Sequence, residues 1–145
     1  FSVEKLMALS GGKRFSDYAE QIEKDFSSAD LVVAHNISFD AMFMSAEFER
    51  INREFCVKDT FCSMKKSTPL CKLPRSSGQG YKYPKLSELC AFFDIDDIEI
   101  QNATEHIFGT KTGFHDARFD TTALLLAVNK GVRDRNVYKE ILNCL

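Results

Sequence analysis

The chain has 145 residues, of which 44% are hydrophobic and 28% are charged, and its formal net charge is −2 at pH 7. This length and composition predict one globular domain with an apolar core and exclude a disordered or fibrous protein. The slightly negative charge excludes a general basic field for nucleic acid, so any contact of that kind must be local.

The cysteines and the apolar runs indicate in which cellular compartment the protein is expected. The five cysteines are an odd number and include no CxxC pair, which argues against a disulfide framework and a zinc ribbon. We therefore expect core or surface thiols in a reducing, cytoplasmic setting. No apolar run approaches the ~18 residues of a membrane span, and the first residues lack the form of a signal peptide, so no membrane contact is expected.

The predicted elements begin with two helices. Residues 1–10 have helical periodicity that ends at Gly11 and Gly12. A second, amphipathic helix is predicted from Ser16 to Ser28. Its buried stripe is expected to comprise Tyr18, Ala19, Ile22 and Phe26.

A short strand, a sharp turn and a helix follow, and the rest of the chain is organised around them. Residues 31–34 form an apolar run that is typical of a strand buried on both faces of a sheet. Over residues 38–52 the period changes to that of a helix with one apolar face, which comprises Phe39, Met42, Phe43 and Ala46. Ligands of open α/β sheets bind beyond the carboxyl ends of strands, where His35, Asn36 and Asp40 are expected to lie.

The middle of the chain is predicted to hold a second strand and a long basic loop. Residues 55–64 suggest a strand parallel to the first, because a helix joins the two. The loop over residues 65–85 has no acidic residue, and its basic residues are Lys65, Lys66, Lys72, Arg75, Lys82 and Lys85. Tyr81, Lys82 and Tyr83 join positive charge to aromatic rings, a combination that holds single-stranded nucleic acid, although a charge run can also be solvated surface.

The last third of the chain is predicted to contain three helices. The first covers residues 86–93 and is followed by an acidic surface segment over residues 94–99. The second begins at Asp116 as its N-cap and is stopped by Gly131. Its inward register is expected to comprise Ala117, Thr121, Leu124 and Val128. The third begins near residue 136 and is expected to dock through Val137, Ile141 and Leu145.

A second polar cluster, His115-Asp-Ala-Arg-Phe-Asp120, stands at the head of the late helix. His115 and Asp120 can serve one site only if His115 precedes the helix, because five helical residues would turn them ~140° apart. Asp40 and Asp120 then both stand at helix starts next to an imidazole. Carboxylate oxygens suit Mg²⁺ and Mn²⁺, and a nearby histidine is suited to take a proton from water.

Two segments resemble motifs of a known family. AHNISFD, residues 34–40, is similar to the second motif of the DEDDh 3′→5′ exonucleases, and HDARFD, residues 115–120, is similar to the third. This group includes the proofreading subunit of bacterial replicative polymerase, and the resemblance covers residues 15–130. It implies an RNase H-like α/β fold with a mixed sheet flanked by helices. It also implies two-metal hydrolysis of phosphodiester bonds from the 3′ end of DNA or RNA, with release of nucleoside monophosphates.

The resemblance also assigns roles to residues. It implies that Asp40 and Asp120 hold a pair of Mg²⁺ or Mn²⁺ ions and that His115 is the general base. Asn36 and Phe39 would lie along the 3′-terminal nucleotide. The implied partners are a single-stranded or frayed 3′ end and a DNA polymerase.

The sequence departs from the family at its first motif. That motif is D-x-E on an early strand, and nothing upstream of Asp40 supplies it. The D-x-E at Asp97-Ile-Glu99 lies in the acidic segment. Two parallel strands alone also make a poor sheet, because parallel strands occur almost only in larger sheets. We therefore expect residues 1–145 to be a single exonuclease-like domain that is N-terminally incomplete and lacks a segment of antiparallel strands.

Two other interpretations stay open. A non-catalytic nucleic-acid-binding or polymerase-associated module of the same fold would account for the missing D-x-E. A flavodoxin-like or other α/β domain would use His35 and His115 as structural histidines. DNA and RNA both stay open as substrates, because the choice depends on contacts to the 2′-hydroxyl.

Overall fold

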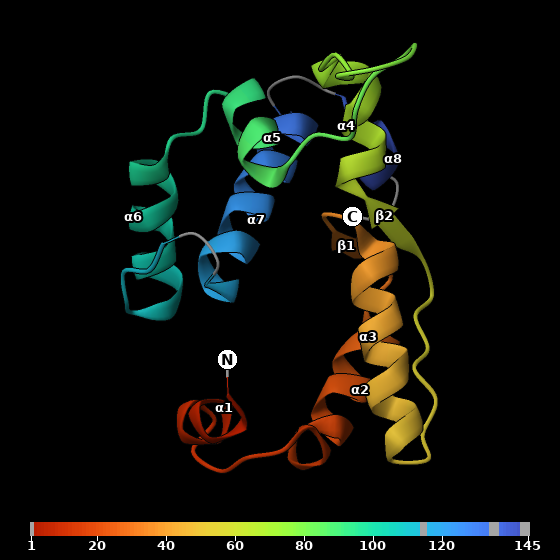
Figure 1. Ribbon diagram of the computed structural model, residues 1–145, viewed down its shortest axis with the longest axis vertical. Helices are drawn as coiled ribbons and strands as arrows, with labels where there is room; N and C mark the ends of the chain where they lie inside the picture. The colour runs from red at the N-terminus through yellow and green to blue at the C-terminus, as the bar shows by residue number, and fades with distance from the viewer. Residues whose placement is uncertain (1, 114–115, 134–136, 143–145) are drawn as a thin grey trace. The chain divides into compact units, whose positions relative to one another are not determined.

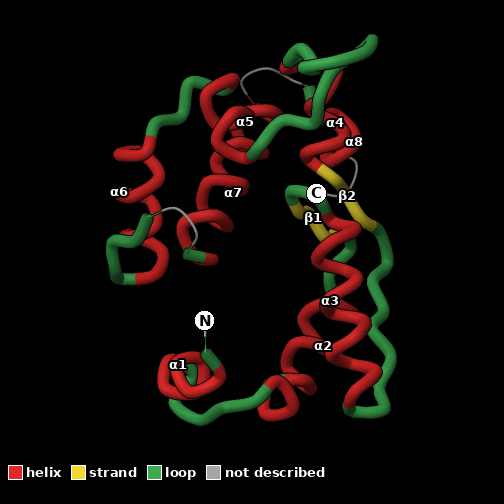
Figure 2. Tube along the Cα trace, in the orientation of Figure 1, coloured by secondary structure: helices red, strands yellow, loops and turns green. Residues whose placement is uncertain are grey.

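The computed structural model describes residues 2–113, 116–133 and 137–142. The chain forms two compact units. The first comprises Phe1–Val32 and Ser38–Thr60, and the second comprises Val33–Ile37 and Phe61–Leu145. Figure 1 labels the helices and strands, and Figure 2 colours the same trace by secondary structure. None of the described helices is long and apolar enough to cross a membrane.

The first unit is mainly helical. It contains α1 (Val3–Leu9), a short 3-10 turn η1 (Phe15–Asp17), α2 (Ala19–Ser28) and nearly all of α3 (Ile37–Arg50). The three helices predicted for this part of the chain are confirmed, with ends shifted by a few residues. After α1, Gly11 and Gly12 adopt positive φ angles of 61° and 79°, which is the conformation that glycine allows at a helix end.

The core of the first unit is a cluster of aromatic rings. Phe48 of α3 is fully buried, and its ring centroid lies 5.1 Å from that of Phe15 and 5.5 Å from that of Phe55. Phe26 of α2 meets Phe55 edge to face at 5.0 Å. Phe55 therefore joins α2 to α3, although it lies in the irregular segment that follows α3.

One predicted apolar face is partly exposed and the other is largely exposed. On α2, Ala19 is buried as predicted, but Tyr18 is 50% exposed. On α3, Phe39, Met42 and Phe43 are each more than half exposed. The reason is that α3 is apolar on more than one side, and the first unit buries the side that carries Phe48.

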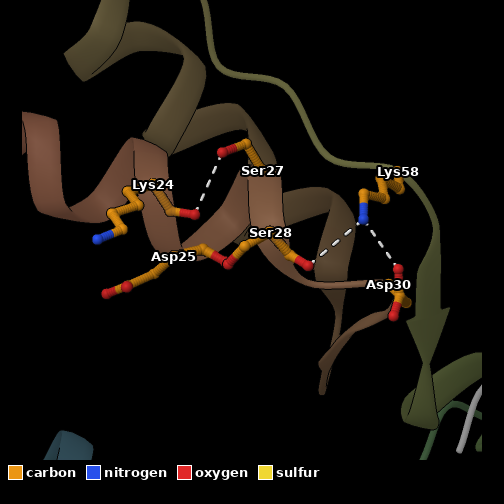
Figure 3. A network of polar contacts seen from close by, with 6 residues as sticks. All are labelled: Lys24, Asp25, Ser27, Ser28, Asp30 and Lys58. Carbon is orange, nitrogen blue, oxygen red and sulfur yellow. Dashed lines mark hydrogen bonds and ion pairs between the residues drawn. The ribbon is translucent and has the colours of Figure 1, made fainter.

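The end of α2 is held by polar contacts, which Figure 3 shows from close by. Ser28 Oγ donates to the carbonyl of Asp25 at 3.0 Å. Lys58 Nζ, from the segment before the second strand, donates to the Ser28 carbonyl at 3.4 Å and to the Asp30 carboxylate at 2.8 Å. The hydrogen bond from Lys58, and then its charge, lower the pKa of Asp30. These contacts satisfy carbonyls that a helix end leaves without partners.

The two predicted strands pair with each other and are short. β1 is Val32–Ala34, β2 is Thr60–Cys62, and the pair is parallel, as predicted. The expectation that the first strand is buried on both faces is wrong, because all three residues of β1 are half-buried. In the described residues β1 has one neighbouring strand, so its other edge is open; the mixed sheet that the resemblance implies is not seen there.

The second unit is built around α7. Its helices are α4 (Ser63–Cys71), α5 (Leu86–Phe92), α6 (Asp97–Phe108), α7 (Ala117–Arg133) and α8 (Lys139–Leu142). As Figure 1 shows, α7 lies against α5, and it also contacts α6 and α8. The core comprises mainly Phe61, Leu89, Phe93, Ile100, Phe119, Ala123, Ala127 and Tyr138.

The end and the register of α7 differ from the prediction. The helix does not stop at Gly131 but runs to Arg133. A Cβ at Gly131 would lie 2.5 Å from the Tyr138 ring and 3.1 Å from Phe93, so glycine serves close packing here.

The predicted stripe comprised Ala117, Thr121, Leu124 and Val128. The buried residues are instead Phe119, Thr122, Ala123, Ala127, Gly131 and Val132. Small residues thus form much of the inward face, and a pattern of large apolar residues does not reveal it.

The predicted basic loop is helical in its first part. α4 extends to Cys71 and contains Pro69, which has no N–H to donate to the Lys65 carbonyl, so the helix lacks that one bond. Residues 72–85 are irregular and turn back on themselves through a β-bridge between Pro74 and Tyr81. The Lys82 N–H also donates to the Leu73 carbonyl at 2.9 Å. We call residues 72–85 the basic hairpin.

The acidic segment leads into a helix that the sequence analysis did not predict. Ile95 is buried, and Asp96 caps α6 by accepting a hydrogen bond from the Glu99 N–H at 2.8 Å. Gly109 ends α6 with a φ of 70°. The only D-x-E of the chain, Asp97-Ile-Glu99, therefore lies in the first turn of a helix. The predicted last helix is present as α8, with Ile141 buried.

Candidate active site

The predicted metal-binding carboxylates stand at the starts of two helices. Asp40 lies in the first turn of α3, in the first unit, and its side chain is exposed. Asp120 lies in the first turn of α7, in the second unit, and is half-buried. His115 lies outside the described residues.

The described residues do not form a metal centre by themselves. Across residues 2–113, 116–133 and 137–142, no group of three or more His, Cys, Asp or Glu side chains could hold an ion. Asp40 and Asp120 have the oxygen chemistry that Mg²⁺ prefers, but they belong to separate units. The described residues by themselves therefore fall short of the ligand set for a pair of ions.

Asp116 shapes the start of α7 just before Asp120. Its Oδ1 accepts hydrogen bonds from the backbone N–H of Arg118 at 3.0 Å and from Nε of the same residue at 2.9 Å. The Oδ2 atom accepts from the guanidinium at 2.7 Å. These hydrogen bonds lower the pKa of Asp116 to about 2. The predicted N-cap role of Asp116 is confirmed, and its carboxylate is engaged by Arg118.

Asp120 lies beside the core of the second unit. It follows Phe119, which is buried, and its charge reaches the Cys90 thiol. Burial raises the pKa of Cys90 to about 11, and the charges of Asp97, Asp120 and Glu99 add to this effect. A thiol with such a pKa is not a nucleophile at neutral pH, so Cys90 is a core thiol, as predicted.

His35 is hydrogen-bonded through both ring nitrogens. Its Nδ1 lies 3.0 Å from Ser63 Oγ, and its Nε2 lies 3.0 Å from the Pro84 carbonyl oxygen. A carbonyl oxygen only accepts, so Nε2 carries the hydrogen and donates it. Ser63 is fully buried at the start of α4, and its hydroxyl also donates to the Ala34 carbonyl at 3.2 Å. His35 therefore connects the end of β1 to α4 and to the basic hairpin.

Asn36 and Phe39, the two predicted contacts to a terminal nucleotide, have distinct settings. Asn36 has a φ of 80°, a left-handed conformation that asparagine tolerates better than most residues. Phe39 is 54% exposed, and its ring lies 4.7 Å from that of Phe43. Asn36 belongs to the second unit and Phe39 to the first.

The structure groups Tyr81, Lys82 and Tyr83 on the basic hairpin. The two tyrosines are 43% and 55% exposed. Lys82 forms an ion pair with Glu88 of α5, which offsets its charge. The Arg75 Nε donates to the Tyr81 carbonyl at 3.0 Å.

Sequence reasoning missed Ser63, Pro84 and Glu88 as neighbours of the candidate site. Ser63 and Pro84 lie 28 and 49 positions from His35, and no local pattern signals contacts over such distances. Glu88 accepts a hydrogen bond from the Lys85 N–H at 2.8 Å, and its pairing with Lys82 has no local sequence signal.

Part of the chain is similar to curated proteins. It is 34% identical over 83 residues to DNA polymerase III subunit epsilon of Escherichia coli (strain K12), which is 57% of this chain and 32% of that protein. The proteins of the same name from Salmonella typhimurium and Salmonella typhi are 35% identical over the same share. The match thus spans about a third of the length of these relatives. No family model matches, and no solved structure matches. The similarity supports the exonuclease relationship that the two motifs imply.

Proposed function

We propose that this chain is part of a metal-dependent 3′→5′ exonuclease with an RNase H-like fold. The observation that carries the proposal is the similarity over 83 residues to DNA polymerase III subunit epsilon. It agrees with the motifs AHNISFD and HDARFD, which resemble the second and third motifs of the DEDDh exonucleases.

The proposed substrate is a single-stranded or frayed 3′ end of DNA, with RNA as the alternative, and the products are nucleoside monophosphates. Asp40 and Asp120 are the proposed ligands of Mg²⁺ or Mn²⁺, and His115 is the proposed general base. Asn36 and Phe39 are proposed to contact the terminal nucleotide. The proposal includes a further D-x-E carboxylate pair, the first motif of the resembled family, from a segment outside residues 1–145.

The basic hairpin is proposed to hold the strand behind its 3′ end. Tyr81 and Tyr83 are exposed, and stacking on an aromatic side chain is worth about 1–3 kcal/mol per base. Lys82 contributes less than its charge suggests, because Glu88 is paired with it. A DNA polymerase is the proposed protein partner, in keeping with the name of the relatives.

The test uses the protein expressed from its complete coding frame, with 5′-labelled single-stranded DNA and RNA. We expect mononucleotides to leave the 3′ end when Mg²⁺ or Mn²⁺ is present and release to stop when EDTA removes the metal. Asp120→Asn and His115→Ala are each expected to lower turnover by roughly 10²-fold or more. Asp25→Asn, an exposed carboxylate on α2, is the matched control and should leave turnover unchanged. Full turnover in Asp120→Asn, or in EDTA, would contradict the proposal.

The alternative is a non-catalytic nucleic-acid-binding or polymerase-associated module. The observation that favours it is that no D-x-E motif precedes Asp40 in residues 1–145. This alternative predicts metal-independent binding of single strands and no hydrolysis. Neutralising Lys65, Lys66, Lys82 and Lys85 should then abolish binding, and unchanged binding would count against it.

A further inference from the structure

His35 lies where two candidate nucleic-acid contacts come together in the second unit. Along the chain its neighbour is Asn36, and across space its Nε2 donates to the carbonyl of Pro84, the residue after Tyr83. The turn after β1 and the last part of the basic hairpin are therefore joined through one imidazole ring. The second bond, to Ser63 Oγ, fixes the plane of that ring.

These hydrogen bonds are shielded from water. Ser63 and the side chain of Pro84 are fully buried, and His35 is half-buried. A shielded carbonyl that loses its donor has no easy replacement, so the bond from His35 to Pro84 is costly to break. The contact is thus suited to hold two segments in a fixed arrangement.

The basic hairpin has an open tip and other ties besides the bond from His35. Gly78 and Gly80 at its tip have positive φ angles of 85° and 91°, and a Cβ at either would meet no atom within 4 Å. Toward its end the hairpin is tied to α5, because Glu88 pairs with Lys82 and accepts from the Lys85 N–H at 2.8 Å. His35 supplies a separate tie, which leads to the end of β1.

We infer that His35 is a positioning residue that holds the basic hairpin against the turn carrying Asn36, so that both contact one nucleic-acid strand. The inference rests on the proposed function for its substrate. Asn36 then meets the terminal nucleotide, and Tyr81 and Tyr83 stack on bases farther along. The ligand is a single strand of several nucleotides, and a mononucleotide ester would use only part of the surface.

The experiment compares a long and a short substrate in the complete protein. We measure hydrolysis of two substrates, a single-stranded 12-mer and the p-nitrophenyl ester of thymidine 5′-monophosphate. The length of the oligonucleotide is on the order of the 4–16 nucleotides that one binding module covers. For His35→Ala we expect KM for the oligonucleotide to rise about tenfold, the effect of losing one stacked base, with kcat and ester hydrolysis unchanged. His35→Gln keeps an amide N–H that reaches the Pro84 carbonyl, so it should restore KM to within about threefold. His106→Ala, on the exposed side of α6, is the matched control.

The outcomes separate this inference from the proposed function. If His35→Ala lowers the hydrolysis of both substrates equally, or leaves KM for the oligonucleotide unchanged, the positioning role is overturned. Neither result contradicts the proposed nuclease activity. If the unchanged protein hydrolyses neither substrate, the proposed function fails, and fluorescence anisotropy of the labelled oligonucleotide then decides the inference. Weaker binding by His35→Ala would support it, and equal binding would overturn it. If His35→Ala fails to fold, Ser63→Ala gives the same comparison with a smaller expected rise in KM, because it removes the Nδ1 partner and the bond to the Ala34 carbonyl but keeps the bond from Nε2 to Pro84.

Discussion

The two units bury their apolar side chains to very different extents. Among the described residues of the first unit, Ala19 and Phe48 are the buried apolar side chains, and a row of large ones on α3 is exposed. The second unit buries apolar residues from β2, α5, α6, α7 and α8, whereas α4 buries Ser63 and Ser67. Small residues on α7, such as Ala123 and Ala127, allow its neighbours to approach closely. The difference shows that a chain rich in apolar residues can contain one unit with a broad core and another that depends on a single aromatic cluster.

The largest expected effect comes from removing the centre of that cluster. Phe48→Ala should destabilise the first unit by about 3–5 kcal/mol, because a fully buried ring leaves a cavity. Met42→Ala on the same helix is the matched control; since Met42 is 58% exposed, its effect should stay within about 0.5 kcal/mol. Hydrogen exchange measures both, and in Phe48→Ala the amides of α3 should lose protection while those of α7 keep it.

Two results would break this contrast. Equal loss of protection in α3 and α7 would mean that the units unfold together. A large effect of Met42→Ala would mean that the exposed face of α3 is covered in solution.

The next effect tests the close packing of the second unit. Gly131→Ala should destabilise it by about 1–3 kcal/mol, because the new Cβ overlaps the Tyr138 ring. The better helix propensity of alanine, worth about 1 kcal/mol, would act in the other direction. Gly113→Ala is the control, since nothing lies within 4 Å of that Cβ. Denaturant unfolding measures both variants, and a stabilised Gly131→Ala would show that Tyr138 can move aside freely.

The smallest effect concerns the start of α7. The pKa of Asp116 is lowered to about 2, so its hydrogen bonds to Arg118 stabilise the folded state above about pH 4 and lose that effect as pH falls toward 2. Asp116→Asn keeps an oxygen that can cap the helix but does not titrate. We expect the difference in unfolding free energy between the two proteins to shrink steadily between pH 4 and pH 2. A constant difference over this range would contradict the assigned pKa.

The sequence predicted elements whose signals are local. The strand, turn and helix around His35 and the N-cap at Asp116 follow from short patterns, and the parallel direction of the two strands follows from the helix that joins them. It did not predict α6, because the acidic residues at its start resemble surface, although Asp96 is its cap. Nor did it predict the buried face of α7 or the role of Gly131, because these depend on how closely other segments approach.

In the candidate site, too, features with a local sequence signal were predicted and contacts between distant residues were not. Both carboxylates, Asp40 and Asp120, were expected at helix starts and are found there. The bonds of His35 to Ser63 and Pro84 could not be predicted, since they join residues that are far apart in the chain. Periodicity places residues on elements, and it does not say which elements meet.

The backbone at Asn36 has a consequence for which residues the turn after β1 can accept. Glycine is the residue that best suits a φ of 80°, and β-branched residues are the least suited. Asparagine adopts this conformation at a modest energetic cost and brings an amide that glycine lacks. In a library of substitutions at position 36, selection for thermal stability alone should therefore enrich glycine. Selection for nucleotide binding should enrich asparagine.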